Sequence, residues 1–436
     1  MPGRPLNNSI RSTILQSPTP IFILVVVPNN TIERSTISEL RLRATVCGIL
    51  VERPRGDMVF SRPRGRVIRV VTAAFLLDAM RSSRPMEGES YPNLVLCENL
   101  EHLDDIYELG VSLLRHATQY SPCRYFGISR SLNDPSDLAS WLGVKPEHLH
   151  SFLPKDREQP VICSVQTYAL TLSESMFKAL AKPTYTAMGL GFSTTSAIVV
   201  VPSRGHCQLV AQELITQHNL HSLTETGFLP ESVSVFEAEG RIASLQEYDL
   251  ANFASRGVGI IHKHIPIAAR QVLLELFAEG LIRVLIIARE AVRSLPVQAG
   301  AVVVLGTQYI EFDPSTSERR LKDYTLVEVV DMQSHAVQQS ESGHFTLFCP
   351  VEDGERFSKF LTDDGLPLES QLLESELLPQ WHKKKTEEGT IRNKQDAIDA
   401  LSFTFLARRV VSNPAYYDLL HGSYSDILSR MVDRLG

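Results

Sequence analysis

The chain has 436 residues, enough for two or three domains, and its 43% hydrophobic and 21% charged residues are typical of a globular protein. A formal net charge of −7 excludes binding of nucleic acid through an overall positive charge, so any basic contact surface must be local. The six cysteines include no CxxC pair, which argues against a zinc site and a disulfide-stapled secreted domain. The longest apolar run, Ile21–Val27, is too short to cross a bilayer.

Residues 1–20 contain arginine, serine and proline but no acid, which predicts a disordered leader. A transit peptide has a similar composition and stays open as an alternative.

Short apolar strands then alternate with helical segments, which predicts an α/β fold. In the first half, strands are expected at Ile21–Val27, 67–71, Leu94–Cys97 and 124–128. A helix is expected over residues 72–80, and another after Asp134 and Pro135 that ends at Gly143.

A second α/β set follows, with apolar strands predicted at Ala197–Val201, 282–287 and Ala301–Leu305. Helices are predicted over 205–216 and from Pro266 to Gly280. Strands this apolar are typical of a parallel sheet covered on both faces. Beyond residue 366 we expect a charged linker at 380–388 and helices at 394–409 and Tyr424–Leu435.

Several segments in this order resemble helicase motifs. Val201-Pro202-Ser203-Arg204 resembles motif IV of superfamily-two helicases. Residues 257–280 are similar to the block that follows it, except that His264 stands where the family has glycine. Residues 131–143 resemble motif III and the next helix, 181–185 the linker between the two motor domains, and 302–309 the strand after motif V. Residues 366–370 and 393–417 are similar to the entry and start of a winged helix.

Together these segments resemble the Ski-type DExH-box RNA helicases, and among them the two-cassette helicase family of the spliceosomal U-five particle. His335-Ala336 is similar to the unusual motif VI of the degenerate C-terminal cassette. The resemblance implies two RecA-like domains, the first truncated, followed by the start of a mainly helical winged-helix domain. The expected ranges are 21–190, 191–365 and 366–436.

The residues that such a motor needs for chemistry are missing or altered. No Gly-Lys dipeptide of a phosphate-binding loop occurs. The family places that loop before the strand that Ile21–Val27 resembles, where only residues 1–20 remain, so we expect the loop and its strand to be absent. Motif V has Ser294 and Leu295 in place of its usual residues.

At the acidic motif the chain has Glu98-Asn99-Leu100-Glu101 and then His102. Glu98 could hold a metal ion, whereas Asn99 is a poor base. Motif III reads Ser129-Arg130-Ser131, and Gln338 stands where the family's finger arginine belongs. We therefore expect no catalytic residue, no metal and no cofactor, and we expect no residual binding of ATP or magnesium, although the sequence leaves open whether a nucleotide still binds. The degenerate motif remnants are Glu98, Asn99, Glu101, Ser129, Ser131, His335 and Gln338.

Three functions stay open. The first is a catalytically inactive, helicase-like cassette in the nucleus that acts as a scaffold for spliceosomal proteins. The second is a fragment or subunit of an ATP-dependent RNA helicase whose motor lies outside this chain. The third is ATP-independent RNA binding, since the resemblance implies that Ser203, Arg204 and the His262 region line an RNA face. The negative net charge predicts that any RNA binding is weak, and neither DNA nor a membrane is expected as a partner.

Overall fold

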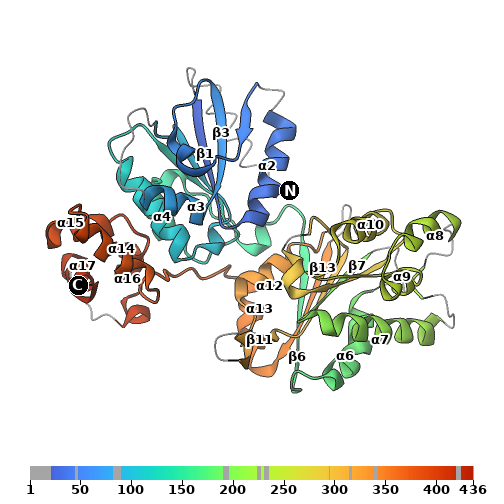
Figure 1. Cartoon of the computed structure of the whole chain (residues 1–436). Helices are drawn as coiled ribbons and strands as arrows, with labels where there is room; N and C mark the ends of the chain where they lie inside the picture. The colour runs from blue at the N-terminus through green and yellow to red at the C-terminus, as the bar shows by residue number, and fades with distance from the viewer. Residues whose placement is uncertain are drawn as a thin grey trace. The chain divides into compact units, whose positions relative to one another are not determined.

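The computed structural model describes residues 21–435 except 45–47, 82–89, 190–195, 223–226, 230–234, 294, 314–316, 338–341 and 419–423 (Figure 1). The expected leader at 1–20 lies outside the described residues. The chain forms two compact units. Unit 1 combines Met1–Ser151 with Leu366–Gly436, and unit 2 is Phe152–Gly365.

Unit 1 is built on a parallel sheet in the order β2-β3-β1-β4-β5. Its strands are β1 (Ile21–Val27), β2 (Leu50–Glu52), β3 (Arg66–Thr72), β4 (Leu94–Cys97) and β5 (Arg124–Gly127). Every residue of β1 and β4 is buried, because both strands are central and apolar. The predicted strands are thus confirmed, with β5 one residue shorter than expected.

Helices α2 (Asn30–Ala44), α3 (Ala73–Arg81), α4 (Asp105–Ala117) and α5 (Ser136–Leu142) lie beside this sheet. The helices after residue 366 pack against α4 and α5; they are α14 (Leu377–Glu387), α15 (Lys394–Leu401), α16 (Leu406–Ser412) and α17 (Tyr424–Leu435). Asp104 caps α4 by accepting a hydrogen bond from the Tyr107 N–H (2.7 Å). Gly143 ends α5 with a φ of 71°, as its position in the sequence predicted.

The C-terminal helices share a core with the first sheet's helices. Leu77 of α3 and Leu109 of α4 pack in one buried cluster with Leu378, Leu406 and Leu428. Residues 366–436, expected as a separate domain, therefore lie in one compact unit with the residues up to Ser151.

The expected charged linker at 380–388 is wrong, because most of it belongs to helix α14. Leu378, Trp381 and Lys385 are buried at a spacing of three and four residues, so one face of this helix packs inward. The helix expected over 394–409 is divided into α15 and α16. The break is stabilised by Thr404, whose hydroxyl accepts a hydrogen bond from the Ala407 N–H (3.1 Å).

Unit 2 contains a six-stranded parallel sheet in the order β6-β13-β10-β7-β9-β8. Its strands are β6 (Val161–Tyr168), β7 (Ala197–Val201), β8 (Val258–Ile261), β9 (Val284–Ala288), β10 (Ala301–Leu305) and β13 (Gly343–Pro350). The boundary expected at residue 190 differs from the structure, in which the units divide after Ser151. The reason is that β6 pairs with β13 along its whole length, from Val161 opposite Gly343.

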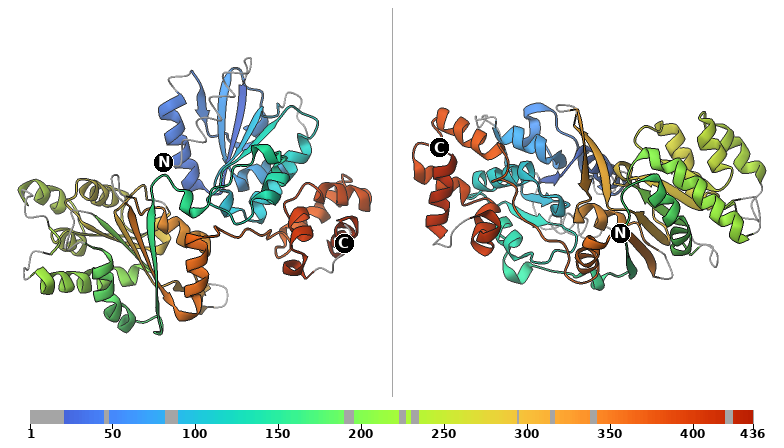
Figure 2. Two further views of the ribbon diagram at one scale, coloured as in Figure 1. Left: turned by 180° about the vertical axis from the view of Figure 1, so that it is seen from behind. Right: turned by 90° about the horizontal axis from the view of Figure 1, so that it is seen from below.

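The helices of unit 2 lie on both faces of its sheet, with α6 and α7 on one side and α8 to α10 on the other (Figure 2). The helices are α6 (Glu174–Ala187), α7 (Arg204–Ser222), α8 (Val235–Ala243), α9 (Tyr248–Ala254), α10 (Ile267–Ala278), α11 (Arg289–Val292), α12 (Leu326–Gln333) and α13 (Gly354–Thr362). A separate antiparallel hairpin joins β11 (Gln308–Asp313) to β12 (Glu318–Asp323). In the part of the chain that the structure describes, no helix is long and apolar enough to span a membrane.

Candidate functional site

The turn after β4 carries the residues expected at the acidic motif. Glu98 follows the strand directly, and its backbone N–H donates to the Val26 carbonyl (2.9 Å). Its carboxyl Oε2 accepts a hydrogen bond from Thr36 Oγ1 on α2 (3.0 Å). Burial raises the pKa of Glu98 to about 7, although the bond from Thr36 acts in the opposite direction. At neutral pH this group is therefore a mixture of acid and carboxylate rather than a full negative charge.

Glu101 is only 3% exposed, and both of its carboxylate oxygens have partners inside unit 1. Oε2 accepts the backbone N–H of Arg130 (3.1 Å), and Oε1 accepts the side-chain amide of Asn99 (3.0 Å). The guanidinium Nε of Arg130 lies 3.7 Å from Oε1. Asn99 itself takes a left-handed conformation with a φ of 55°, which asparagine tolerates better than most residues. Glu101 therefore connects the ends of β4 and β5.

The segment after β5 contains the two serines that were predicted to belong to motif III, Ser129 and Ser131. The Oγ atoms of Ser129 and Ser131 are buried, and no partner for either is found among the described residues. The Ser131 carbonyl accepts the Leu366 N–H (2.8 Å), and Leu132 forms a parallel bridge with Leu366. This turn is therefore joined to the start of the C-terminal helices.

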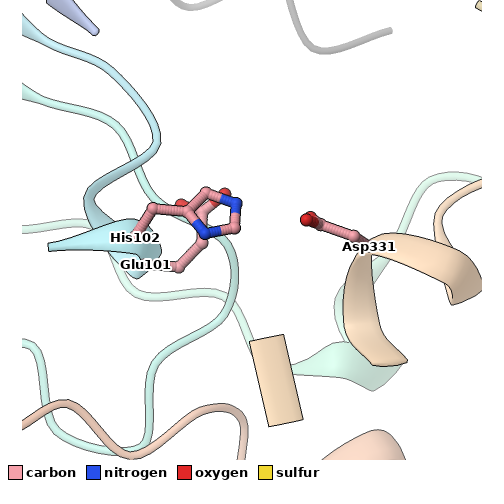
Figure 3. Close-up of side chains that lie close together, drawn as sticks. All are labelled: Glu101, His102 and Asp331. Atoms are coloured by element: carbon pink, nitrogen blue, oxygen red, sulfur yellow. The ribbon is translucent and has the colours of Figure 1, made fainter. Parts of the chain in front are cut away.

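A magnesium-bound nucleotide would need a free carboxylate and a phosphate cradle at this turn. Glu98 is hydrogen-bonded to Thr36, and Glu101 to Asn99 and Arg130, so both acids already have protein partners. Glu101 and His102 both belong to the short 3-10 turn Leu100–His102 (Figure 3). Asp331, drawn with them, is a residue of α12 in unit 2, where it pairs with Arg293 Nε (3.2 Å). The described residues of this turn do not fit the acid pair of a working motor.

In unit 2, Ser203, Arg204 and His262 lie at the carboxyl ends of β7 and β8, the edge where open α/β sheets bind ligands. The Ser203 hydroxyl and His206 Nδ1 are 3.1 Å apart, and Arg204 is exposed at the start of α7. The pKa of His262 is lowered, mainly by burial. The nearby charge of Glu290 acts against this shift, whereas His264 and Arg204 add to it. The structure therefore brings these three predicted contact residues to the same edge of the sheet.

The motif VI remnant has a structural role at His335. Its Nδ1 lies 2.6 Å from the Val297 carbonyl and donates to it, because a carbonyl oxygen can only accept. Ala336 pairs with Ala299 in an isolated parallel bridge. Gln338 and Ser294 lie outside the described residues.

Sequence reasoning missed a polar network that joins α4 and α5 to the C-terminal helices. Glu108 is fully buried and accepts hydrogen bonds from Ser370 Oγ (2.7 Å) and the Leu406 N–H (2.7 Å). Arg409 bridges Glu369 (2.5 Å) and Asp137 (2.7 Å). In the sequence, the only sign of this network is Glu108, an acid beside Leu109 in the apolar stripe of α4. Its partners could not be identified there, because they lie more than 250 residues away.

Comparison with known proteins agrees with this architecture. Residues 369–435 match the model of a winged helix-turn-helix domain. The chain is 30% identical over 362 residues to the pre-mRNA-splicing factor brr2 of Schizosaccharomyces pombe, which covers 80% of this chain and 16% of the relative. It is 30% identical over 336 residues to the DExH-box ATP-dependent RNA helicase DExH12 of Arabidopsis thaliana, which covers 75% and 15%.

The U5 small nuclear ribonucleoprotein 200 kDa helicase of Homo sapiens is 29% identical over 361 residues, covering 80% of this chain and 16% of the relative. The chain thus spans about a sixth of the length of these relatives. The parallel sheets, their motif order and the C-terminal helices are those of RecA-like domains followed by a winged helix. The chain is a homologue of the DExH-box helicases of the U5 small nuclear ribonucleoprotein and corresponds to a cassette of that family.

Proposed function

We propose that this chain is a catalytically silent helicase-like cassette that serves as a protein-interaction scaffold in pre-mRNA splicing in the nucleus, and that it corresponds to the degenerate C-terminal cassette. The observation that carries the proposal is the bonding of Glu101. In the position of the acidic motif this side chain is buried and held by Asn99 and Arg130. The amide, the backbone N–H and the guanidinium around it occupy lone pairs that a water molecule or a magnesium ion would use in a working motor.

The surrounding framework supports a role as a stable body. The central strands of both sheets are fully buried, and the C-terminal helices share a core with α3 and α4. The names of the relatives, a splicing factor and a helicase of the U5 particle, support splicing as the process. Spliceosomal proteins are therefore the proposed partners, and no nucleotide or metal cofactor is proposed.

The first experiment measures ATP hydrolysis and the binding of a fluorescent ATP analogue by the purified chain, with and without RNA. An active DExH-box relative serves as the positive control. We expect no turnover above the blank and no saturable nucleotide binding. Turnover that disappears in both E98Q and E101Q would overturn the silent assignment.

A second experiment addresses the scaffold itself. The tagged chain is purified from nuclear extract, and co-purifying proteins are identified by mass spectrometry beside an unrelated bait with the same tag. We expect enrichment of proteins of the U5 particle. Recovery of none of them would contradict the splicing role while leaving the absence of ATP turnover unaffected.

ATP-independent RNA binding is the second candidate, favoured by the position of Ser203, Arg204 and His262 at one carboxyl edge. Filter binding of single-stranded RNA over a range of salt concentrations tests it. An affinity that does not fall as salt rises would exclude phosphate contacts and with them this candidate.

A further inference from the structure

A groove runs along helix α2 of unit 1 and reaches Arg53, the residue that follows the edge strand β2. It measures about 660 Å³ and opens to solvent. Helix α2 packs against β2 and β3. The groove is lined by Arg34, Ile37, Ser38, Arg41, Leu42 and Arg53.

Five of these lining residues form one continuous stripe of α2, because positions 34, 37, 38, 41 and 42 follow helical spacing. Ile37 is 8% exposed and forms the floor, whereas Leu42 is 80% exposed at one end. Leu50 on β2 is 59% exposed as well. Ile37 and Leu42 therefore give the groove an apolar part, and Leu50 adds exposed apolar surface on the neighbouring strand.

Strand β2 offers the backbone for an additional strand. Among the described residues it pairs only with β3, from Leu50 opposite Val67 to Glu52 opposite Arg69. Within the described ranges no strand pairs with its other side, so the backbone N–H and C=O groups there are positioned to accept an added strand. A helix that runs beside an open strand edge is the arrangement in which peptide-binding domains add a strand from their ligand.

The charges of the groove select an acidic occupant. Three arginines and no acid line it, although the chain as a whole carries a net charge of −7. Arg53 is held in place by Glu33 (2.9 Å) and by the Asn30 side chain (3.0 Å). Its guanidinium is thereby fixed at the end of β2, at the border of the groove. Because Glu33 neutralises Arg53, Arg34 and Arg41 supply the positive charge that an acidic segment would meet along the helix.

We propose that this groove binds an extended acidic segment of a protein partner, which pairs with the open edge of β2 as an added strand. Alternate side chains of such a strand face α2. The side chain opposite Ile37 is aliphatic, and the side chains two positions before and after it, which face Arg34 and Arg41, are aspartate or glutamate. Arg34 and Arg41 are separated by about 10 Å along the helix axis, close to the roughly 13 Å between the first and fifth residues of a strand.

A protein segment fits this surface better than RNA does. The lining contains no aromatic side chain on which a base would stack. Ile37 lies between Arg34 and Arg41 along the helix, and Leu42 follows Arg41; a sugar-phosphate backbone would leave both apolar side chains uncovered. The inference is independent of ATP chemistry and goes beyond the proposed scaffold role by naming a surface and the chemistry of its partner.

The test uses the full chain and a fluorescein-labelled peptide that repeats the pattern Asp-Thr-Ile-Thr-Asp, followed by fluorescence polarisation. We expect R41E to weaken peptide binding about ten-fold or more, because a favourable charge becomes a repulsive one. R43E is the matched control, since Arg43 lies on the same helix and is exposed but does not line the groove. We expect R43E to change the affinity by no more than about two-fold.

Two altered probes complete the test. A peptide with N-methyl groups on alternate residues keeps its side chains but cannot pair along β2, and we expect it to lose binding. A uridine oligonucleotide is expected not to compete. Equal effects of R41E and R43E, undiminished binding of the methylated peptide, or competition by the oligonucleotide would each overturn the proposal. Circular dichroism of both variants confirms that they are folded, and the absence of nucleotide keeps the result separate from the ATPase test.

Discussion

The polar residues at the carboxyl ends of the strands differ between the two sheets in their hydrogen bonding and exposure. In unit 1, Glu98 and Glu101 have partners within the unit, on α2 and after β5. In unit 2, Ser203 and His262 are half-buried and Arg204 is exposed. The acids at the carboxyl edge of the unit 1 sheet are therefore hydrogen-bonded within the protein, whereas the carboxyl edge of the unit 2 sheet presents polar groups to solvent.

This difference indicates which properties each unit retains. A carboxylate that anchors a turn contributes to folding, and its loss is measured as a change in stability. A serine or arginine at an open edge contributes to binding, and its loss leaves the fold unchanged. Variants in unit 1 should therefore affect unfolding, and variants at the edge of unit 2 should leave unfolding unchanged.

The largest effect is expected from R409M. It leaves the half-buried carboxylates of Glu369 and Asp137 without their cation, and breaking a buried pair in this way costs about 3–5 kcal/mol. Urea denaturation of the full chain measures the loss, with R392M, an exposed arginine of the same helical region, as the control. A loss below that of R392M would show that this network does not hold the C-terminal helices to α5.

The next effect concerns pH. Burial raises the pKa of Glu108 to about 7, above its value in the unfolded chain. The folded state then binds the proton more tightly, so the free energy of unfolding is highest below the unfolded pKa and falls as pH rises through 7. We expect a fall on the order of 2–3 kcal/mol between pH 5 and 8, measured by urea denaturation at each pH.

The variant E108Q should remove the part of that fall that Glu108 contributes, while Glu98, whose pKa burial also raises to about 7, keeps its own part. A glutamine carbonyl can still accept the Leu406 N–H, and its amide can donate to Ser370 Oγ. The exposed Glu147 provides the matched control E147Q, which should keep the parental pH dependence. An unchanged slope in E108Q would assign the pH dependence to other groups.

A smaller effect is expected at the remnant of the acidic motif. R130M and E101Q should each destabilise the chain by about 1–2 kcal/mol, since each removes one side of a buried contact. In the double variant the losses should be less than additive, because the two side chains contact each other. Denaturation of all four proteins gives the coupling energy. Strict additivity would mean that Arg130 and Glu101 do not stabilise the turn together.

Much of the fold follows from apolar patterning alone. Leu94–Cys97, Ala197–Val201 and Ala301–Leu305 are continuous apolar runs, and the structure has strands at these residues. Strand β6 escaped prediction because it lies at a sheet edge and is half exposed, so it shows no clear period. Helix α14 was missed because Lys383-Lys384-Lys385 resembles a solvated linker, although Lys385 is buried and pairs with Glu388 (2.8 Å).

The candidate site was predictable only in part. Substitution of the motif residues is visible in the sequence, since Asn99 and Gln338 cannot perform the roles of a base and a cation. The hydrogen bond from Arg130 to Glu101 is not visible in the sequence. It depends on how the turns after the neighbouring strands β4 and β5 meet. The bonding of Glu98 to Thr36 likewise joins residues 62 positions apart.

The smallest change in free energy is expected from R204A, and this variant tests the difference between the two units most directly. R204A should leave the unfolding midpoint unchanged, because Arg204 is exposed. If the edge of unit 2 contacts RNA phosphate, the same variant should weaken binding by about 1 kcal/mol and reduce the slope of affinity against salt by roughly one counterion. Exposed Arg320 on the hairpin, paired with Glu318, provides the control R320A. An equal loss of RNA affinity in both variants would mean that binding follows overall charge, and the edge of unit 2 would then be no more a binding surface than the bonded turn of unit 1.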